Sequence, residues 1–174
     1  MTVLEKKICM MGAPGVGKTS LVRRFVDSVF SEKYLSTIGV KIDKKSVPVD
    51  DHTLNLMLWD LQGEERYQWV RLQYLKGASG YILVADGTRQ DTLEVALGLQ
   101  ENAAGRAEEL PFVLCLNKAD LWGQWGISAT QQEWLKENAK FQRSREGLGI
   151  RWEASRACEL LGDREETEQG DKEK

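Results

Sequence analysis

Residues 12–19 read GAPGVGKT, directly after an apolar run and just before a helical pattern at 20–29. They match G-x-x-x-x-G-K-[ST], in which glycines let consecutive backbone N–H groups curl around an anion. The helix that follows adds a favourable dipole at its N-terminus. Lys18 places a cation on the β and γ phosphates, and the Thr19 hydroxyl offers an oxygen to Mg²⁺. The sequence therefore predicts a phosphate-binding loop. Its expected nucleotide contacts are Gly12, Ala13, Pro14, Gly15, Val16, Gly17, Lys18, Thr19 and Ser20.

Apolar runs and amphipathic stretches alternate on both sides of this loop, which is typical of an α/β sheet. The β-rich runs fall at residues 4–11, 40–49, 53–61, 80–86, 112–117 and 149–153. Only Asp50, Asp51 and His52 separate the second run from the third, so these two runs are expected to form an antiparallel hairpin. The other runs are far enough apart to pair in parallel. We therefore expect a mostly parallel six-stranded sheet with one antiparallel edge hairpin and helices on both faces.

Length and composition indicate a single domain inside the cell. A chain of 174 residues, 41% of them hydrophobic, can bury a core, and residues 1–161 are the expected domain. Residues 162–174 are almost entirely charged or polar, so we expect a mobile tail there. A net charge of −3 argues against nucleic acid as the main partner. The chain shows no bilayer-spanning run and no signal peptide, and Cys9 and Cys115 read as buried thiols, which favours the cytoplasm.

A second motif names the base. Residues 117–120 read NKAD, with Asn117, Lys118 and Asp120 at the end of an apolar strand, where α/β sheets bind ligands. The Asp120 carboxylate can accept hydrogen bonds from N1–H and from the exocyclic amine of guanine. Adenine presents an acceptor at the same edge, which a carboxylate does not match. The two motifs together therefore favour GTP over ATP.

With these motifs the chain resembles the small GTPases of the Ras superfamily over about residues 3–158. The stretches TIGV at 37–40 and WDLQG at 59–63 are most similar to the Rab branch. The resemblance implies a Ras-like G domain in which Thr19, Thr37 and Asp60 hold Mg²⁺. It also implies that Thr37 and the Gly63 N–H contact the γ-phosphate. Segments that contact only this phosphate and its metal lose their partner on hydrolysis, so the resemblance implies a molecular switch.

Four further nucleotide contacts follow from the resemblance. Phe30 falls where the family has an aromatic edge against guanine, and Tyr34 where it has a lid over the phosphates. An ordinary core position is the alternative interpretation for each of these two side chains. Residues 153–157, EASRA, occupy the last guanine-contacting loop, where Ser155 matches the usual Ser-Ala-Lys pattern. Arg156 departs from that pattern and is carried over as a backbone contact alone. Lys118 is implied to pack its stem over the base and to brace the phosphate loop.

The catalytic pattern breaks at two positions. The implied catalytic residues are Lys18, Thr37, Gly63 and Glu64. Glu64 stands where the family has a glutamine that orients the attacking water. An ionised carboxylate cannot donate a hydrogen bond to the phosphoryl group. At about 6 Å from the phosphate oxygens it is also repelled by about 3 kcal/mol per charge pair, at an effective dielectric constant of about 20. Pro14 lacks an N–H and crowds the space of an incoming arginine finger. Slow hydrolysis is therefore expected, unless Glu64 acts as a base, or Gln62 or a partner residue positions the water.

The resemblance further implies protein effectors and regulators that contact residues 30–42 and 62–76. The second segment is aromatic and aliphatic, although packing on the protein's own sheet accounts for part of it. The chain ends without a cysteine to prenylate and has Thr2 rather than glycine after Met1, so no lipid anchor is expected. In that respect it resembles prokaryotic small GTPases.

Three functions from different classes are compatible with the sequence. The first is a Mg²⁺-dependent switch that binds GTP and GDP and hydrolyses GTP slowly. The second is an interaction or scaffold protein that holds GTP or GDP and barely turns it over, which Glu64 and Pro14 keep open. The third, an ATP-using enzyme such as a kinase, is disfavoured by Asp120.

Overall fold

The computed structural model describes residues 2–28, 36–63, 72–104 and 110–138. The elements in chain order are β1 (Thr2–Met11), α1 (Lys18–Asp27), β2 (Val40–Val49), β3 (His52–Leu61), η1 (Leu72–Leu75), β4 (Gly80–Asp86), α2 (Gln90–Ala104), β5 (Phe112–Asn117), η2 (Ala119–Gln124) and α3 (Ala129–Asn138). The two η elements are short 3₁₀ helices. No helix in these described ranges is long and apolar enough to cross a membrane.

The five strands that the structure describes form one sheet in the order β2-β3-β1-β4-β5. β1 pairs in parallel with both β3 and β4, and β4 pairs in parallel with β5. β2 lies at the edge and pairs antiparallel with β3. The expected α/β class, the mostly parallel sheet and the antiparallel edge hairpin are thus confirmed. The strand expected at 149–153 lies outside the described residues and stays a prediction.

The hairpin turn is shorter than the sequence pattern indicates. Val49 pairs with His52, so His52 belongs to β3 and the turn consists of Asp50 and Asp51 alone. Asp50 has φ 50°, a left-handed conformation that aspartate tolerates and that two-residue hairpin turns use. β1 similarly begins at Thr2 rather than at residue 4. Backbone pairing therefore extends these strands past the end of their apolar patterns.

The first helix also has different ends from the expected 20–29. It spans Lys18–Asp27, so the last residues of the phosphate-loop motif form its first turn. Gly17, with φ 101°, caps its N-terminus. Ser28 enters the left-handed region at φ 55° and donates its N–H to the Arg24 carbonyl, which ends the helix.

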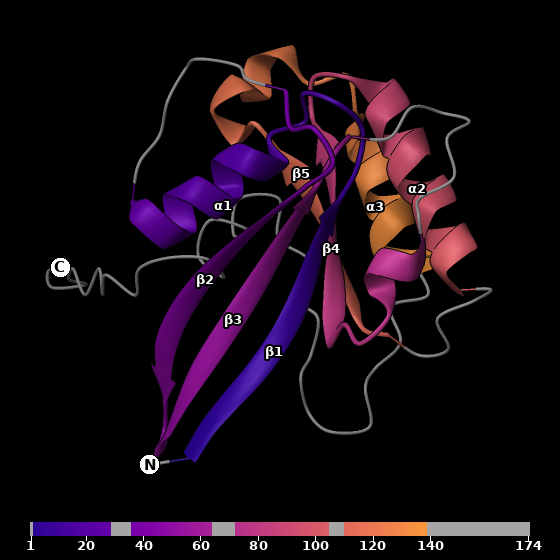
Figure 1. Ribbon diagram of the computed structural model, residues 1–174. Helices are drawn as coiled ribbons and strands as arrows, with labels where there is room; N and C mark the ends of the chain where they lie inside the picture. Colours follow the sequence, from indigo (N-terminus) through magenta and orange to yellow (C-terminus); the bar gives the residue numbers. More distant parts are fainter. Residues whose placement is uncertain (1, 29–35, 64–71, 105–109, 139–174) are drawn as a thin grey trace, which may run out of the picture.

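Helices cover both faces of the sheet, as Figure 1 shows for α1 on one side and α2 and α3 on the other. Alternate strand residues explain this layering, since successive side chains of a strand point to opposite faces. Met10, Val84 and Cys115 pack in one buried cluster with residues of α1. Their neighbours Cys9 and Leu83 pack in the other with residues of α2 and α3. Cys9 and Cys115 are both buried free thiols, as predicted.

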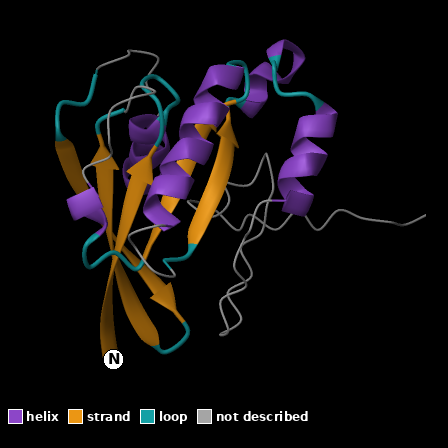
Figure 2. Cartoon of the chain, turned by 90° about the vertical axis from the view of Figure 1, so that its right-hand side faces the viewer, coloured by secondary structure: helices purple, strands orange, loops and turns teal. Residues whose placement is uncertain are grey.

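The sheet has one end without helices and one end that carries loops. The start of β1 and the turn between β2 and β3 extend beyond the helices (Figure 2), and β4 pairs only with Ile8–Met11 of β1. At the opposite end the four parallel strands finish together. The loops that follow β1, β3, β4 and β5 therefore meet at a single edge, where ligands of open α/β sheets bind.

Candidate functional site

Four chemically distinctive residues end the parallel strands at this edge. Gly12 follows β1, Asp60 is the last residue but one of β3, and Asp86 and Asn117 are the last residues of β4 and β5. The pairing register brings Asp86 directly opposite Asn117. It also places Asp60 opposite Met10, two residues before Gly12. The phosphate loop and the base motif therefore share one edge of the sheet, although their lysines, Lys18 and Lys118, are 100 residues apart in the chain.

The phosphate loop is shaped by close contacts that only glycine permits. A Cβ on Gly12 would lie 2.2 Å from the Val84 carbonyl oxygen, and one on Gly17 would lie 2.3 Å from Asn117 Nδ2. Both glycines have positive φ, 144° and 101°. The Lys18 side chain is only 6% exposed. Its Nζ donates to the carbonyl oxygens of Gly12 at 2.8 Å and Ala13 at 2.9 Å.

Three oxygen-bearing side chains converge beside the first turn of α1. The Thr19 hydroxyl donates to Asp60 Oδ2 at 2.5 Å and lies 2.8 Å from the Thr37 hydroxyl. Thr37 also donates to Asp60 Oδ2, at 3.4 Å. Two threonine hydroxyls and one carboxylate are hard oxygen ligands of the kind that Mg²⁺ prefers. The residues that resemblance assigns to the metal are thus gathered at one point.

One oxygen of the buried Asp60 carboxylate has no hydrogen-bond partner among the described residues. Asp60 is completely buried, and within the described part of the chain its Oδ1 has no hydrogen-bond partner. Burial raises the pKa of this carboxyl above its usual value, against the hydrogen bond from Thr19 and the charge of Lys18, which lower it. A buried acceptor without a partner is costly, and a cation is one group that satisfies it. The arrangement therefore fits a divalent cation.

The segments around Thr37 and Gly63 are tied together by backbone and side-chain contacts. The Gln62 N–H donates to the Gly39 carbonyl at 2.8 Å, and the Gly39 N–H donates to Gln62 Oε1 at 3.0 Å. The amide oxygen of Gln62 is thus used to join the two segments. Gly63 lies against the phosphate loop, since a Cβ there would be 2.5 Å from the Pro14 Cα. A displacement of either segment would therefore also move the other segment and the phosphate loop.

The base motif sits at the end of β5 and is joined to the phosphate loop. Asn117 Nδ2 donates to the Val16 carbonyl at 2.8 Å. Lys118 has φ 66° and caps the N-terminus of the 3₁₀ helix η2, whose first residues include the exposed Asp120. The Trp125 Nε1–H donates to the Lys118 carbonyl at 2.9 Å and holds this turn in place. In the structure Asn117 thus contacts the phosphate loop, and the bracing that resemblance implied for Lys118 stays a prediction.

Lys118 pairs with Asp86, a residue that the sequence reasoning missed. Asp86 is completely buried, and its Oδ2 lies 2.6 Å from Lys118 Nζ and 3.1 Å from Arg89 Nε. Its Oδ1 accepts from the Thr88 N–H at 3.0 Å and hydroxyl at 2.7 Å. Burial alone would raise the pKa of Asp86, but the hydrogen bonds from Lys118, Thr88 and Arg89 outweigh it and lower this pKa. The available signal was an aspartate at the end of a buried apolar strand, as Asp86 ends β4.

We predict that Asp86→Asn destabilises the protein by about 2 kcal/mol at pH 7, because two cations lose their counter-ion. The pKa of Asp86 is lowered on folding. Its contribution is therefore complete above the unfolded pKa of about 3.9 and is lost as the pH falls through the lower folded pKa. Urea unfolding of both proteins at pH 7, 5 and 3 should show the stability gap shrinking only at pH 3.

Asp43→Asn provides a matched control, since Asp43 makes an exposed ion pair with Lys41 at 2.7 Å. Exposed pairs contribute about 0.5 kcal/mol, so this variant should be nearly as stable as the parent. A gap for Asp86→Asn that is equally large at pH 3 and pH 7 would contradict the electrostatic explanation.

The structure thus locates most of the predicted site residues and leaves some of them outside the described ranges. It brings the phosphate loop, Thr37, Asp60, Gly63, Asn117 and Lys118 to one edge of the sheet. The predicted residues outside the described ranges are Phe30, Tyr34, Glu64, Ser155 and Arg156. Their assigned roles stay predictions, as do the binding roles of the residues that the structure locates.

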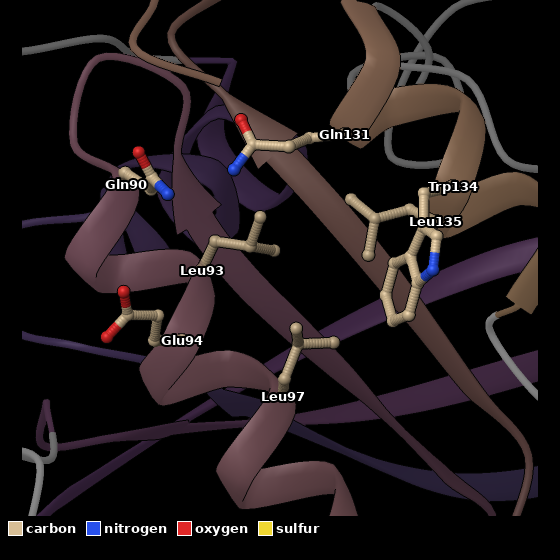
Figure 3. A pocket seen from close by; sticks show the side chains of 7 residues that line it. All are labelled: Gln90, Leu93, Glu94, Leu97, Gln131, Trp134 and Leu135. Atoms are coloured by element: carbon tan, nitrogen blue, oxygen red, sulfur yellow. The ribbon is translucent and has the colours of Figure 1, made fainter. Parts of the chain in front are cut away.

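A hollow of about 130 Å³ lies between α2 and α3. Figure 3 shows leucine side chains and an indole around it, and its lining is Gln90, Leu93, Glu94, Leu97, Gln131, Trp134 and Leu135. None of these residues belongs to the predicted nucleotide site. This hollow is therefore separate from the loop cluster at the strand ends.

Comparisons with known proteins cover the part of the chain that holds the phosphate loop and the base motif. Residues 7–144 match the family model described as the Ras family. The chain is also similar to the Ras-related protein RabJ of Dictyostelium discoideum, with 35% identity over 119 residues. The alignment covers 68% of this chain and 46% of RabJ. The chain thus spans about half the length of this curated relative.

Proposed function

This chain belongs to the Ras family of small GTPases and is Rab-like, and on that premise we propose that it is a Mg²⁺-dependent GTP-binding switch that hydrolyses GTP to GDP and phosphate. One observation carries the proposal above the others. Thr19, Thr37 and Asp60 gather beside a glycine-shaped phosphate loop, and the buried Asp60 Oδ1 lacks a partner in the described residues. A phosphate-bound divalent cation would satisfy this oxygen.

The residues of the loop supply most of what phosphoryl transfer needs, because this reaction depends mainly on positioning and charge stabilisation. Lys18 lies under the loop carbonyls of Gly12 and Ala13, where its ammonium group would neutralise the β and γ phosphates. Bound Mg²⁺ would draw off further charge from the same two phosphates. Thr19, Thr37 and Asp60 would hold the ion. The backbone N–H of Gly63, which lies against Pro14 of the loop, would orient the γ-phosphate.

The switch itself would reside in the two segments that Gly39 and Gln62 join. Loss of the γ-phosphate would remove the partner of Thr37 and of Gly63, and both segments would relax together. Ile38, between Thr37 and Gly39 in the first of these segments, is 91% exposed and is therefore accessible to a partner. We therefore place the contacts with effectors and regulators at residues 30–42 and 62–76.

The test is to load the purified protein with GTP in the presence of Mg²⁺ and to follow the ratio of bound GTP to GDP over hours. First-order conversion to GDP would support a switch that resets itself. A protein that retains neither nucleotide would overturn the proposal. Retention of GTP without conversion would favour the second candidate function.

That second candidate is a GTP-bound or GDP-bound scaffold that hardly hydrolyses its nucleotide. Pro14 favours it, because the proline ring is exposed on the phosphate loop next to Gly63 and removes an N–H. Glu64 favours it too, since a carboxylate at the water-orienting position cannot donate to the phosphoryl group. The Glu64 carboxylate predicts intrinsic hydrolysis about one to two decades slower than with glutamine, and Pro14 predicts weak stimulation by an arginine finger.

We predict that Glu64→Gln raises single-turnover hydrolysis at least severalfold, because it removes a negative charge near the γ-phosphate. The measurement is the rate of GTP conversion in preloaded protein at saturating Mg²⁺. Glu5→Gln, a change on exposed β1, provides a charge-matched control and should leave the rate unchanged. An unchanged or lower rate in Glu64→Gln would show instead that Glu64 acts as a base or that another residue positions the water.

A further inference from the structure

Arg89 connects the phosphate loop to the buried aspartate at the end of β4. It lies in the turn between β4 and α2. Its Nη2 donates to the Pro14 carbonyl at 2.9 Å, and its Nε donates to Asp86 Oδ2 at 3.1 Å. The same Asp86 oxygen accepts from Lys118 of the base motif. One guanidinium group therefore links the loop that would hold the phosphates to the turn that would hold the base.

The contact with Pro14 has a direct consequence for the loop. The carbonyl of Pro14 and the N–H of Gly15 belong to one planar trans peptide and point in opposite directions. Holding this carbonyl toward Arg89 turns the Gly15 N–H away from Arg89 and toward the inside of the loop. Asn117 does the same two peptides further on, where its bond to the Val16 carbonyl orients the Gly17 N–H. Two N–H groups of the anion cradle are thus oriented by side chains from β4 and β5 loops.

Arg89 is itself well placed to act as a clamp. Its N–H donates to the Asp86 carbonyl at 2.9 Å, and its carbonyl accepts from the hydroxyl of the fully buried Thr92 at 2.7 Å. A planar guanidinium group with several fixed donors can serve two acceptors at once with little further ordering. Pro14 adds to the effect, because its ring fixes φ and leaves its carbonyl as its only backbone hydrogen-bonding group.

We propose that Arg89 is a positioning residue that holds the Pro14–Gly15 peptide in its phosphate-binding orientation and thereby slows release of the guanine nucleotide. This inference rests on the proposed function, since it concerns the same nucleotide site. Arg89 acts through the loop rather than on the reacting phosphate. Its loss should therefore change how long the nucleotide stays bound and leave the rate of the chemical step nearly unchanged.

The test measures release of a fluorescent GDP analogue from the full chain after addition of excess GDP with Mg²⁺. Arg89→Ala should release the analogue about tenfold faster, as expected for one lost charge-assisted contact that is partly exposed. Arg24→Ala removes an exposed arginine at the end of α1 and should release it at the parental rate. Arg89→Lys keeps the charge but cannot reach Asp86 and Pro14 with separate nitrogens, so an intermediate rate is expected.

A rescue experiment separates positioning from a general loss of structure. Guanidinium chloride at millimolar concentration should slow release from Arg89→Ala, while the same concentration of sodium chloride should not. If Arg89→Ala does not fold, Arg89→Gln replaces it and should also release the analogue faster than the parent. Glutamine keeps most of the side-chain length but cannot form the ion pair with the Asp86 carboxylate.

The outcomes distinguish this inference from the proposed function. If the parent protein retains no guanine nucleotide, the proposed function is wrong. If the parent retains GDP and Arg89→Ala releases it at the same rate, the proposed function stands and the role of Arg89 is overturned. Slower GTP conversion with unchanged release would also overturn it, since Arg89 would then act on the reacting phosphate.

Discussion

Replacing Asp120 with asparagine is expected to transfer the base preference of this protein from guanine to xanthine. The parent carboxylate would accept two hydrogen bonds, from N1–H and from the exocyclic amine of guanine. Asparagine offers one acceptor and one donor, and the donor suits the C2 carbonyl of xanthine. Sites that recognise a polar group by buried hydrogen bonds discriminate by about a hundredfold or more, so GTP affinity should fall by at least that factor.

The measurement is displacement of a fluorescent GDP analogue by GTP, xanthosine triphosphate and ATP. The structure supports a local effect, because Asp120 is exposed in the turn η2. Trp125 and Asn117 hold this turn without using the Asp120 side chain. Asp51→Asn, in the exposed hairpin turn, is a suitable control and should leave all three affinities unchanged.

Unchanged GTP affinity in Asp120→Asn would show that Asp120 does not select the base. A parent protein that prefers ATP would revive the third function considered from the sequence, an ATP-using enzyme. Both results would leave the phosphate loop unaffected, because its contacts do not involve Asp120.

Lys18→Ala is expected to abolish nucleotide retention, with a fall in affinity of at least about a thousandfold. Lys18 serves two purposes in the structure. Its Nζ donates to the carbonyl oxygens of Gly12 and Ala13, and the same ammonium group would face the β and γ phosphates. Removing it leaves two loop carbonyls without this donor and removes the cation, and hydrogen bonds to charged groups contribute about 1.5–3 kcal/mol each.

The nucleotide content of the purified protein and equilibrium binding of the GDP analogue would both report this loss. Lys44→Ala, in the exposed part of β2, removes a lysine that lies outside the site and should bind as the parent does. Lys18→Gln should fail to bind as well, although it keeps a donor for the two carbonyls. Retention of GDP by Lys18→Gln at the parental affinity would show that the ammonium charge is dispensable.

The parts of the site that the sequence could predict are those encoded in short, contiguous patterns. The loop at residues 12–19 carries its glycines, its lysine and its threonine within eight positions, and a strand and a helix flank it as expected. The base motif at 117–120 is equally local and ends a strand as expected. Short β-rich apolar runs predicted the five strands that the structure describes, and the short gap of Asp50, Asp51 and His52 predicted the hairpin. Only the ends of these elements differed, because backbone pairing and capping decide where a strand or helix stops.

What the tertiary structure alone decided is which distant side chains meet. Arg89 contacts the Pro14 carbonyl across 75 residues, and Asn117 contacts the Val16 carbonyl across 101. These contacts exist because β4 pairs with both β1 and β5, which brings three loops to one edge of the sheet. Asp86 depends on the tertiary structure in the same way. Its carboxylate connects two loops only because the fold brings Arg89 and Lys118 to it. A local pattern predicts the residue types of a site, but the sheet register sets their partners, and this is why the link through Asp86 and Arg89 was not visible in the sequence.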